Sequence, residues 1–420
     1  MIYLVVFIFL RRHFKFLKDE VWSKVLLFSM VLFLARLADA IISFWAPVQI
    51  QNVLNNSVVM GFIISFQSLV GLLADLVFPK ILKNVRVKKL IYFGLAMSAL
   101  TSFFLVSSYY WPFVSIFLVT MALWGIYYEF IAFANYQFMG SVVPLNMRAG
   151  AWGVTGIFVN LAYFLGPLLA SILLLRGQWV TEGVILAFLM MSFVLLTFSK
   201  NTHDIPVTID LTEINPVIEL KHWISLARHI WPAIVISMLL GFIDSTFWTT
   251  GTIWTEKLSA QSAWGGLFLP LYQLPPIFLG LLVARWAISK GKKILSEKML
   301  IVAGIFLAGL ALSNKIPWQL TMVFFASCAL SVCYPLIEGV YTDIVARMGK
   351  EKKEMIGLTN SALNLSYIVW PPIAGAITLA VGERLTFSIV GVLTVVTAFI
   401  LLFVTPKKLR LPQEEIKAWD

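Results

Sequence analysis

The sequence is poor in charge, cysteine and histidine. Only 13% of its 420 residues are charged and 60% are hydrophobic, whereas a soluble chain carries roughly 25% charged residues. An ordinary soluble protein is therefore excluded. The two cysteines, Cys328 and Cys333, point about 140° apart on one predicted helix and cannot pair. The four histidines show no metal-ligand spacing, so we expect no metal and no cofactor.

Long hydrophobic runs take the place of these residue types. Met1–Leu10 is too short to cross ~30 Å of hydrocarbon, and basic residues follow it rather than precede it as in a secretory signal. Twelve later runs have spanning or near-spanning length. They lie at about 25–50, 57–79, 89–108, 112–139, 150–175, 181–199, 230–254, 262–288, 298–314, 317–345, 356–381 and 385–405. The sequence therefore predicts an all-α integral membrane protein with 12 transmembrane helices.

The longest polar connection divides these runs into two sets of six. We predict an N-terminal interfacial segment at 1–21, a six-helix bundle at 22–199, a linker at 200–229, a second bundle at 230–406 and a tail at 407–420. Basic residues gather in the loops after the second and eighth runs, which predicts cytoplasmic termini and a multi-pass protein of the plasma (inner) membrane. The net charge of +11 thus follows from topology and not from nucleic-acid binding.

One stretch occurs twice. Residues 153–170, GVTGIFVNLAYFLGPLLA, recur as 357–374, GLTNSALNLSYIVWPPIA, with seven of 18 positions identical. The matches include Asn160/Asn364, Tyr163/Tyr367 and Pro167/Pro371. We expect both helices to be interrupted at the Asn and the Pro, which a membrane tolerates only beside other helices or a water cavity. Two such helices at matching positions indicate a transporter built from internal repeats.

Four acids also match between the halves. Asp39 parallels Asp244 at an offset of 205 residues, and Glu129 parallels Glu338 at an offset of 209. A carboxylate in the bilayer centre costs roughly 2.5–3.5 kcal/mol, so each of these acids has a functional interpretation. In a poorly hydrated cavity a carboxyl group can load and release protons, and an ionised one attracts a cation. For Asp39, an ion pair with Arg36 is the alternative.

Polar and aromatic residues at helical spacing surround these acids. Such faces suit flat or cationic organic solutes, although plain packing accounts for them equally well. The predicted substrate cavity comprises Arg36, Tyr136, Asn160, Trp248, Tyr334, Tyr341 and Asn364. Asp343 lies near the end of the run at 317–345, and we expect it to pair with Arg347 one turn later.

A loop motif resembles that of the major facilitator superfamily. Gly71 and Asp75 precede the basic residues Arg86, Lys88 and Lys89. The second half has Gly280, Arg285, Lys292 and Lys293, with Ala284 where an acid is expected. The resemblance covers about 22–406 and implies two pseudo-symmetric six-helix bundles, the MFS fold. It also implies that spans one, four, seven and ten line a central cavity, and the four acids fall on these spans.

Gly166 and Pro167 form a pair that is similar to the glycine-proline pair of exporters in this family. The second half has Trp370 and Pro371 at that place. Small residues at this spacing also let two helices approach closely. Helix packing at Gly166, Pro167 and Pro371 is therefore the alternative to a role in export.

These features predict a secondary active transporter that moves a small organic solute by alternating access. We expect a monomer in the lipid bilayer that is coupled to protons, with efflux of a lipophilic or cationic compound slightly favoured. Proton-coupled uptake of a sugar or other nutrient is one alternative, and a non-transporting receptor or scaffold of the same fold is another. No nucleophile-base pair or phosphate loop is evident, so an enzyme is not expected.

Overall fold

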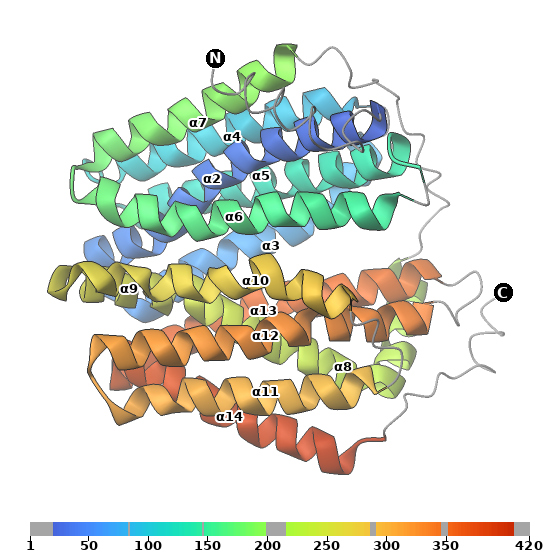
Figure 1. Ribbon diagram of the computed structural model, residues 1–420. Helices are drawn as coiled ribbons and strands as arrows, with labels where there is room; N and C mark the ends of the chain where they lie inside the picture. Colours follow the sequence, from blue (N-terminus) through green and yellow to red (C-terminus); the bar gives the residue numbers. More distant parts are fainter. Residues whose placement is uncertain are drawn as a thin grey trace. The chain divides into compact units, whose positions relative to one another are not determined.

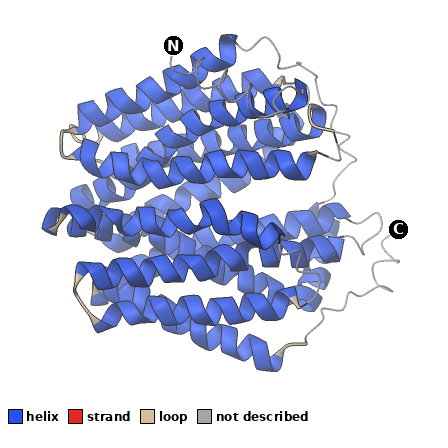
Figure 2. Ribbon diagram, in the orientation of Figure 1, coloured by secondary structure: helices blue, strands red, loops and turns tan. Residues whose placement is uncertain are grey.

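The computed structural model describes residues 20–82, 85–144, 147–198, 216–285, 291–345 and 352–406. Every regular element within these ranges is a helix (Figure 2). This outcome confirms the all-α prediction, because only helices satisfy all backbone hydrogen bonds within one hydrophobic segment that crosses lipid.

The helices of the first half match the first six hydrophobic runs (Figure 1). They are α2 (Glu20–Leu54), α3 (Ser57–Ile81), α4 (Val87–Ser107), α5 (Val114–Ser141), α6 (Arg148–Leu174) and α7 (Gln178–Phe198). Their connections are short, as expected between antiparallel neighbours in a helical bundle.

The second half begins with α8 and α9, which together form its first apolar segment. Its helices are α8 (Pro216–Trp248), α9 (Thr250–Gln261), the 3₁₀ helix η2 (Ala263–Leu267), α10 (Phe268–Arg285), α11 (Lys292–Ala308), η3 (Gly309–Leu312), α12 (Ile316–Val345), α13 (Lys352–Val381) and α14 (Glu383–Val404). Within the described ranges, 11 helical segments are long and apolar enough to cross a membrane, with 223–261 counted as one. The remaining predicted span coincides with α10.

Two expectations about helix continuity differ from the structure. Helix α8 begins at Pro216, inside the predicted linker, and continues into the membrane segment. Proline is well accommodated at the first helical position, and no glycine or proline interrupts the chain before Pro232. The expected interruptions at Pro167 and Pro371 are wrong, because α6 and α13 are continuous through both prolines. Each proline nevertheless lacks the N–H that would bond the carbonyl four residues earlier.

The described residues divide into two compact units. One lies within Met1–Ile42 and Leu73–Asp210, and the other within Ser43–Leu72 and Leu211–Asp420. In the first unit α4 packs on α5 and α7, and in the second α11 packs on α12 and α14 (Figure 1). These are the third, fourth and sixth spans of each half, so the duplicated sequence has duplicated packing. The predicted bundle limits at 22–199 and 230–406 stay a prediction.

Small residues permit close helix contacts inside each unit. A Cβ atom added to Gly166 of α6 would lie 2.3 Å from the Cβ of Ala40 on α2. In the second unit, a Cβ on Gly61 of α3 would lie 2.4 Å from the carbonyl oxygen of Pro371. Both distances are shorter than real Cβ contacts, so a side chain at either glycine would force the two helices apart.

Candidate functional site

Asp39 lies at the centre of a polar cluster in the first unit. Its side chain on α2 is fully buried. The Tyr163 hydroxyl on α6 donates to Oδ2 over 2.6 Å, and Trp124 Nε1 on α5 donates to Oδ1 over 2.8 Å. Arg36 Nη1 lies 3.2 Å from Oδ2. Three helices thus supply donors to one carboxylate, as a buried charge requires.

Arg36 is itself held between aromatic rings. Its side chain is 14% exposed, and its guanidinium carbon lies 5.0 Å from the ring centre of Tyr128 and 5.5 Å from that of Tyr127. Cation–π attraction therefore adds to the ion pair with Asp39. The geometry agrees with the ion-pair interpretation of Asp39 that the sequence left open.

Asp244 forms the corresponding cluster in the second unit. It lies on α8 and is partly buried. The Tyr272 hydroxyl of α10 donates to Oδ1 over 2.5 Å, and the Tyr367 hydroxyl of α13 donates to Oδ2. The nearby Tyr334 hydroxyl donates to the Leu240 carbonyl oxygen over 3.3 Å. Within this unit, the described residues give Asp244 no ion pair, so its partners are neutral.

The two clusters share a duplicated pair. Asp39 and Asp244 match in sequence, and Tyr163 and Tyr367 match in the repeated stretch. In each unit the tyrosine donates its hydroxyl hydrogen to the aspartate. The place of Arg36 is taken by Gly241, at the same offset of 205 residues. The aspartate–tyrosine hydrogen bond is therefore present in both halves. Only the first half has a cation at the position of Arg36, because the second half has Gly241 there.

The two glutamates have different surroundings. Glu129 on α5 is partly buried and has the Asp75 carboxyl group of α3 as a neighbour. Glu338 on α12 is exposed. The sequence match between Glu129 and Glu338 therefore does not extend to their environments.

The predicted cavity residues are spread over both units. Tyr341, which follows Glu338 by one turn, bonds the Ser237 hydroxyl of α8 over 2.8 Å. Tyr136 is 63% exposed, and its ring centre lies 5.4 Å from that of Trp152. The other members are partly buried: Asn160 on α6, Trp248 on α8 and Asn364 on α13.

In the second half, the two lysines of the loop motif form ion pairs. Lys292 Nζ lies 2.7 Å from an Asp343 carboxylate oxygen, so Asp343 pairs across helices. The expected partner of Asp343, Arg347, lies outside the described residues. Lys293 Nζ lies 2.6 Å from Glu297 Oε1 and donates to Thr405 Oγ1. Gly280 and Arg285 belong to α10, but their side chains lie outside the described part of the structure.

In the first half the loop motif lies at the end of α3 and the start of α4. Gly71 is buried and Asp75 is partly buried on α3. Arg86 is exposed and occupies the N-cap position of α4, and Lys88 and Lys89 lie in its first turn.

Sequence reasoning missed several residues of these clusters. Trp124 and Tyr272 lie far from the aspartates along the chain and carry no local signal. Tyr163 and Tyr367 are identical positions of the repeated stretch. Because the aspartates also match between the halves, the sequence could have suggested that each tyrosine contacts its aspartate. Glu182 on α7 was also missed: it is 5% exposed and accepts from the Ser102 hydroxyl over 3.1 Å. Among the described residues, no group of His, Cys, Asp and Glu is arranged to hold a metal ion.

The family profile of the Major Facilitator Superfamily matches residues 28–350 and 271–419. The chain belongs to the Major Facilitator Superfamily. No curated protein sequence matches it. Solved structures of the same fold include a peptide transporter POT in complex with sulfate, with TM-score 0.72, 12% identity and coverage of 94% of this chain and 95% of that one.

Two further transporters resemble this member of the superfamily in structure. The nucleoside transporter NupG has TM-score 0.72 and 12% identity, over 91% of this chain and 100% of its own. The human organic anion transporter MFSD10 (TETRAN) has TM-score 0.58 and 17% identity, over 90% and 98%. At such identities the likeness shows the fold. The family indicates a multi-pass membrane transporter of small molecules and not an enzyme.

Proposed function

We propose that this transporter is driven by protons and that Asp244 is the group that carries the proton. The supporting observation is the contrast between Asp244, whose described partners are tyrosine hydroxyls, and Asp39, which has Arg36. A carboxylate next to a guanidinium stays ionised, whereas one surrounded by neutral donors in a membrane is free to bind a proton. An intramembrane acid without a cation is by default a functional group.

Protonation of Asp244 alters how two helices are joined. The ionised carboxylate accepts from Tyr272 and Tyr367 together. A protonated carboxyl group has a donor on one oxygen, which becomes a weaker acceptor, so the hydroxyl bond to that oxygen weakens or reverses. Tyr367 lies four residues before Pro371, where α13 already lacks one backbone hydrogen bond. Proton binding thus acts on α13 at a weakened turn, which links it to alternating access.

For the solute, we propose efflux of a lipophilic or cationic compound. Asp244 and the exposed Glu338 offer negative charge in the second unit, and the tyrosines Tyr334 and Tyr341 lie on the same helix as Glu338. Aromatic faces beside carboxylates suit organic cations. In this proposal the protein works as a monomer in the plasma (inner) membrane, with both termini cytoplasmic.

The test is flux in proteoliposomes with an imposed pH gradient. Ethidium serves as a cationic probe, and glucose and a mixture of amino acids serve as nutrient probes. We expect the gradient to drive ethidium, and Asp244→Asn to reduce this driven flux at least tenfold while solute exchange without a gradient continues. Glu129→Gln and Glu338→Gln are measured beside it. Glu383→Gln is the matched control, because Glu383 pairs with Lys257 outside the two clusters.

Each result bears on a separate part of the proposal. Normal gradient-driven flux in Asp244→Asn refutes its role as the proton carrier. Loss of driven flux only in Glu129→Gln assigns that role to the Glu129–Asp75 pair instead. Gradient-driven movement of glucose or amino acids, without ethidium, favours nutrient uptake. Absence of flux for every probe, in a protein that binds them in a thermal-shift screen, favours the receptor or scaffold.

A further inference from the structure

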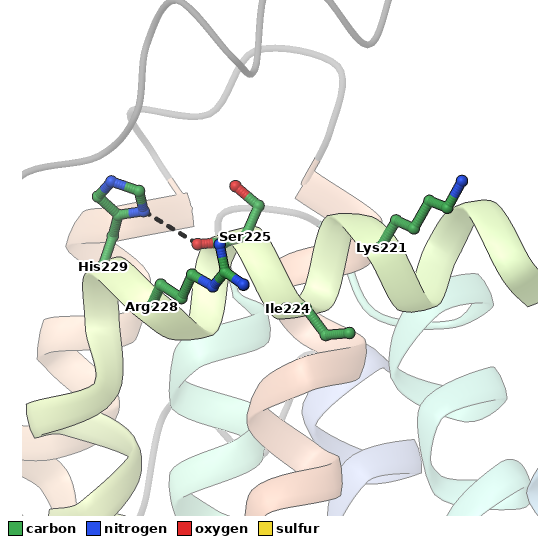
Figure 3. A pocket seen from close by; sticks show the side chains of 5 residues that line it. All are labelled: Lys221, Ile224, Ser225, Arg228 and His229. Carbon is green, nitrogen blue, oxygen red and sulfur yellow. Dashed lines mark hydrogen bonds between the residues drawn. The ribbon is translucent and has the colours of Figure 1, made fainter.

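A basic cavity lies on the early turns of α8, before Asp244 along the same helix. It has a volume of about 240 Å³ and is lined by Lys221, Ile224, Ser225, Arg228 and His229 (Figure 3). These positions are spaced by three and four residues, so they share one face of the helix. Figure 3 shows the side chains along this face, with His229 Nδ1 2.9 Å from the Ser225 carbonyl oxygen.

The charges of this cavity are uncompensated within the described structure. Lys221 and Arg228 are exposed, and neither forms an ion pair with a described residue. None of the described residues that line the cavity is an acid. A guanidinium, an ammonium, an imidazole and a hydroxyl are spread along this face of the helix (Figure 3), and such donors suit the oxygens of a phosphate group.

The opposite face of the same turns is anchored in the protein. Leu226 and Ile230 are fully buried. The basic face is therefore held toward the outside by packing, and it does not depend on a mobile segment. The arrangement is that of an amphipathic helix whose apolar side is covered by its own unit.

The cavity's stretch of chain also overlaps a candidate membrane segment. Residues 223–261 are long and apolar enough to cross a membrane, and four of the five lining residues fall within this range. Ile224 is 47% exposed and lines the cavity, and Trp231 is 43% exposed two residues beyond it. Exposed tryptophan marks the interface between lipid and water. Basic groups with an exposed apolar side chain at this level fit a molecule that has both a phosphate and an acyl part.

We propose that this cavity binds the phosphate headgroup of an anionic phospholipid, in the leaflet on the side where α8 begins. Lys221 and Arg228 neutralise the headgroup, Ser225 and His229 complete its hydrogen bonds, and Ile224 contacts the start of the acyl chains. Because α8 carries Asp244 further along, the lipid fixes the end of the helix that bears the proposed proton carrier. The binding itself is independent of the proposed transport function.

The experiment measures lipid binding to the full-length protein after delipidation in detergent. Phosphatidylglycerol, phosphatidylcholine and inorganic phosphate are titrated in turn, with bound lipid counted by native mass spectrometry and the apparent unfolding temperature recorded. We expect phosphatidylglycerol to bind and to raise that temperature, and the other two to have little effect. Lys221→Gln combined with Arg228→Gln lowers the affinity for phosphatidylglycerol by roughly 30-fold, from about 1 kcal/mol per basic group.

Lys298→Gln provides the matched control, since it removes one exposed lysine of α11 outside the cavity. Its affinity for phosphatidylglycerol stays within about twofold of the wild type, because the lysine is not a ligand. Single Lys221→Gln replaces the double variant if the latter does not fold. Equal binding of phosphatidylglycerol by variant and wild type overturns the proposal, as does equal binding of phosphatidylcholine. If inorganic phosphate binds and phosphatidylglycerol does not, the cavity is a site for free phosphate and the lipid proposal is wrong.

Discussion

The Asp39 and Asp244 clusters occupy matching places in the two halves and differ in one respect that decides their chemistry. Both aspartates accept a hydroxyl from the tyrosine of the repeated stretch. Asp39 has Arg36 within 3.2 Å, and Asp244 has Gly241 at the matching position. One cluster is a compensated ion pair, and the other is a single acid among neutral donors.

Under the proposed function, this difference separates a structural role for Asp39 from a proton-carrying role for Asp244. The Asp39 cluster, with its ion pair to Arg36, joins α2, α5 and α6 through one carboxylate. A lone carboxyl group keeps the same helix contact through tyrosine but has to exchange a proton to change its charge. If Asp39→Asn and Asp244→Asn change the stability of the protein equally, the two clusters do not differ in this way.

Asp39→Asn has the largest expected effect on stability. It leaves the Arg36 guanidinium buried without its counter-charge, and such a loss costs about 3–5 kcal/mol. Asp244→Asn removes no charge partner, because an amide oxygen still accepts from a tyrosine hydroxyl. Thermal unfolding of the purified proteins measures this difference. Arg36→Gln combined with Asp39→Asn recovers part of the loss, and equal unfolding temperatures for the two single variants contradict the comparison.

Removal of the shared tyrosine hydroxyl has the next largest effect. Tyr367→Phe leaves Asp244 with one described donor, Tyr272, and costs about 1.5–3 kcal/mol, as for a hydrogen bond to a charged group. Tyr163→Phe costs less, because Arg36 and Trp124 still satisfy Asp39. The same unfolding measurement compares the pair. A larger loss in Tyr163→Phe would show that the arginine does not stabilise the carboxylate.

The fold was predictable from the sequence because the relevant signals are local. Hydrophobic run length marks the spans, and basic loops predict their direction. Continuity of α6 and α13 was not predictable, since a proline indicates a lost hydrogen bond but not whether neighbouring helices hold the turn. The extension of α8 into the predicted linker was not predictable for a related reason: no glycine or proline lies between Pro216 and Pro232 to mark a boundary.

The clusters were predictable only in part. Repeated residues identified both aspartates and both tyrosines, but their contact depends on how α2 packs on α6 and α8 on α13. The partners that distinguish the clusters, Trp124 and Tyr272, have no counterpart in the repeat. The two glutamates match in sequence but have different surroundings: Glu129 lies beside Asp75, whereas Glu338 is exposed. Sequence correspondence therefore predicts position along a helix better than it predicts environment.

The smallest expected effect concerns how each half packs the helix that bears the tyrosine. At matching positions α6 has Gly166 against Ala40, whereas α13 has Trp370, whose ring stacks on Phe242 at 4.3 Å. Gly166→Ala forces α2 and α6 apart at the level of Asp39 and lowers the free energy of unfolding by about 1–2 kcal/mol, within the usual cost of overpacking.

Gly156→Ala is the control, because no atom lies within 4 Å of the added Cβ. This variant unfolds at or above the wild-type temperature, since alanine is the better helix former. If Gly166→Ala unfolds like Gly156→Ala, the close contact does not hold Tyr163 against Asp39, and the two halves differ only in charge.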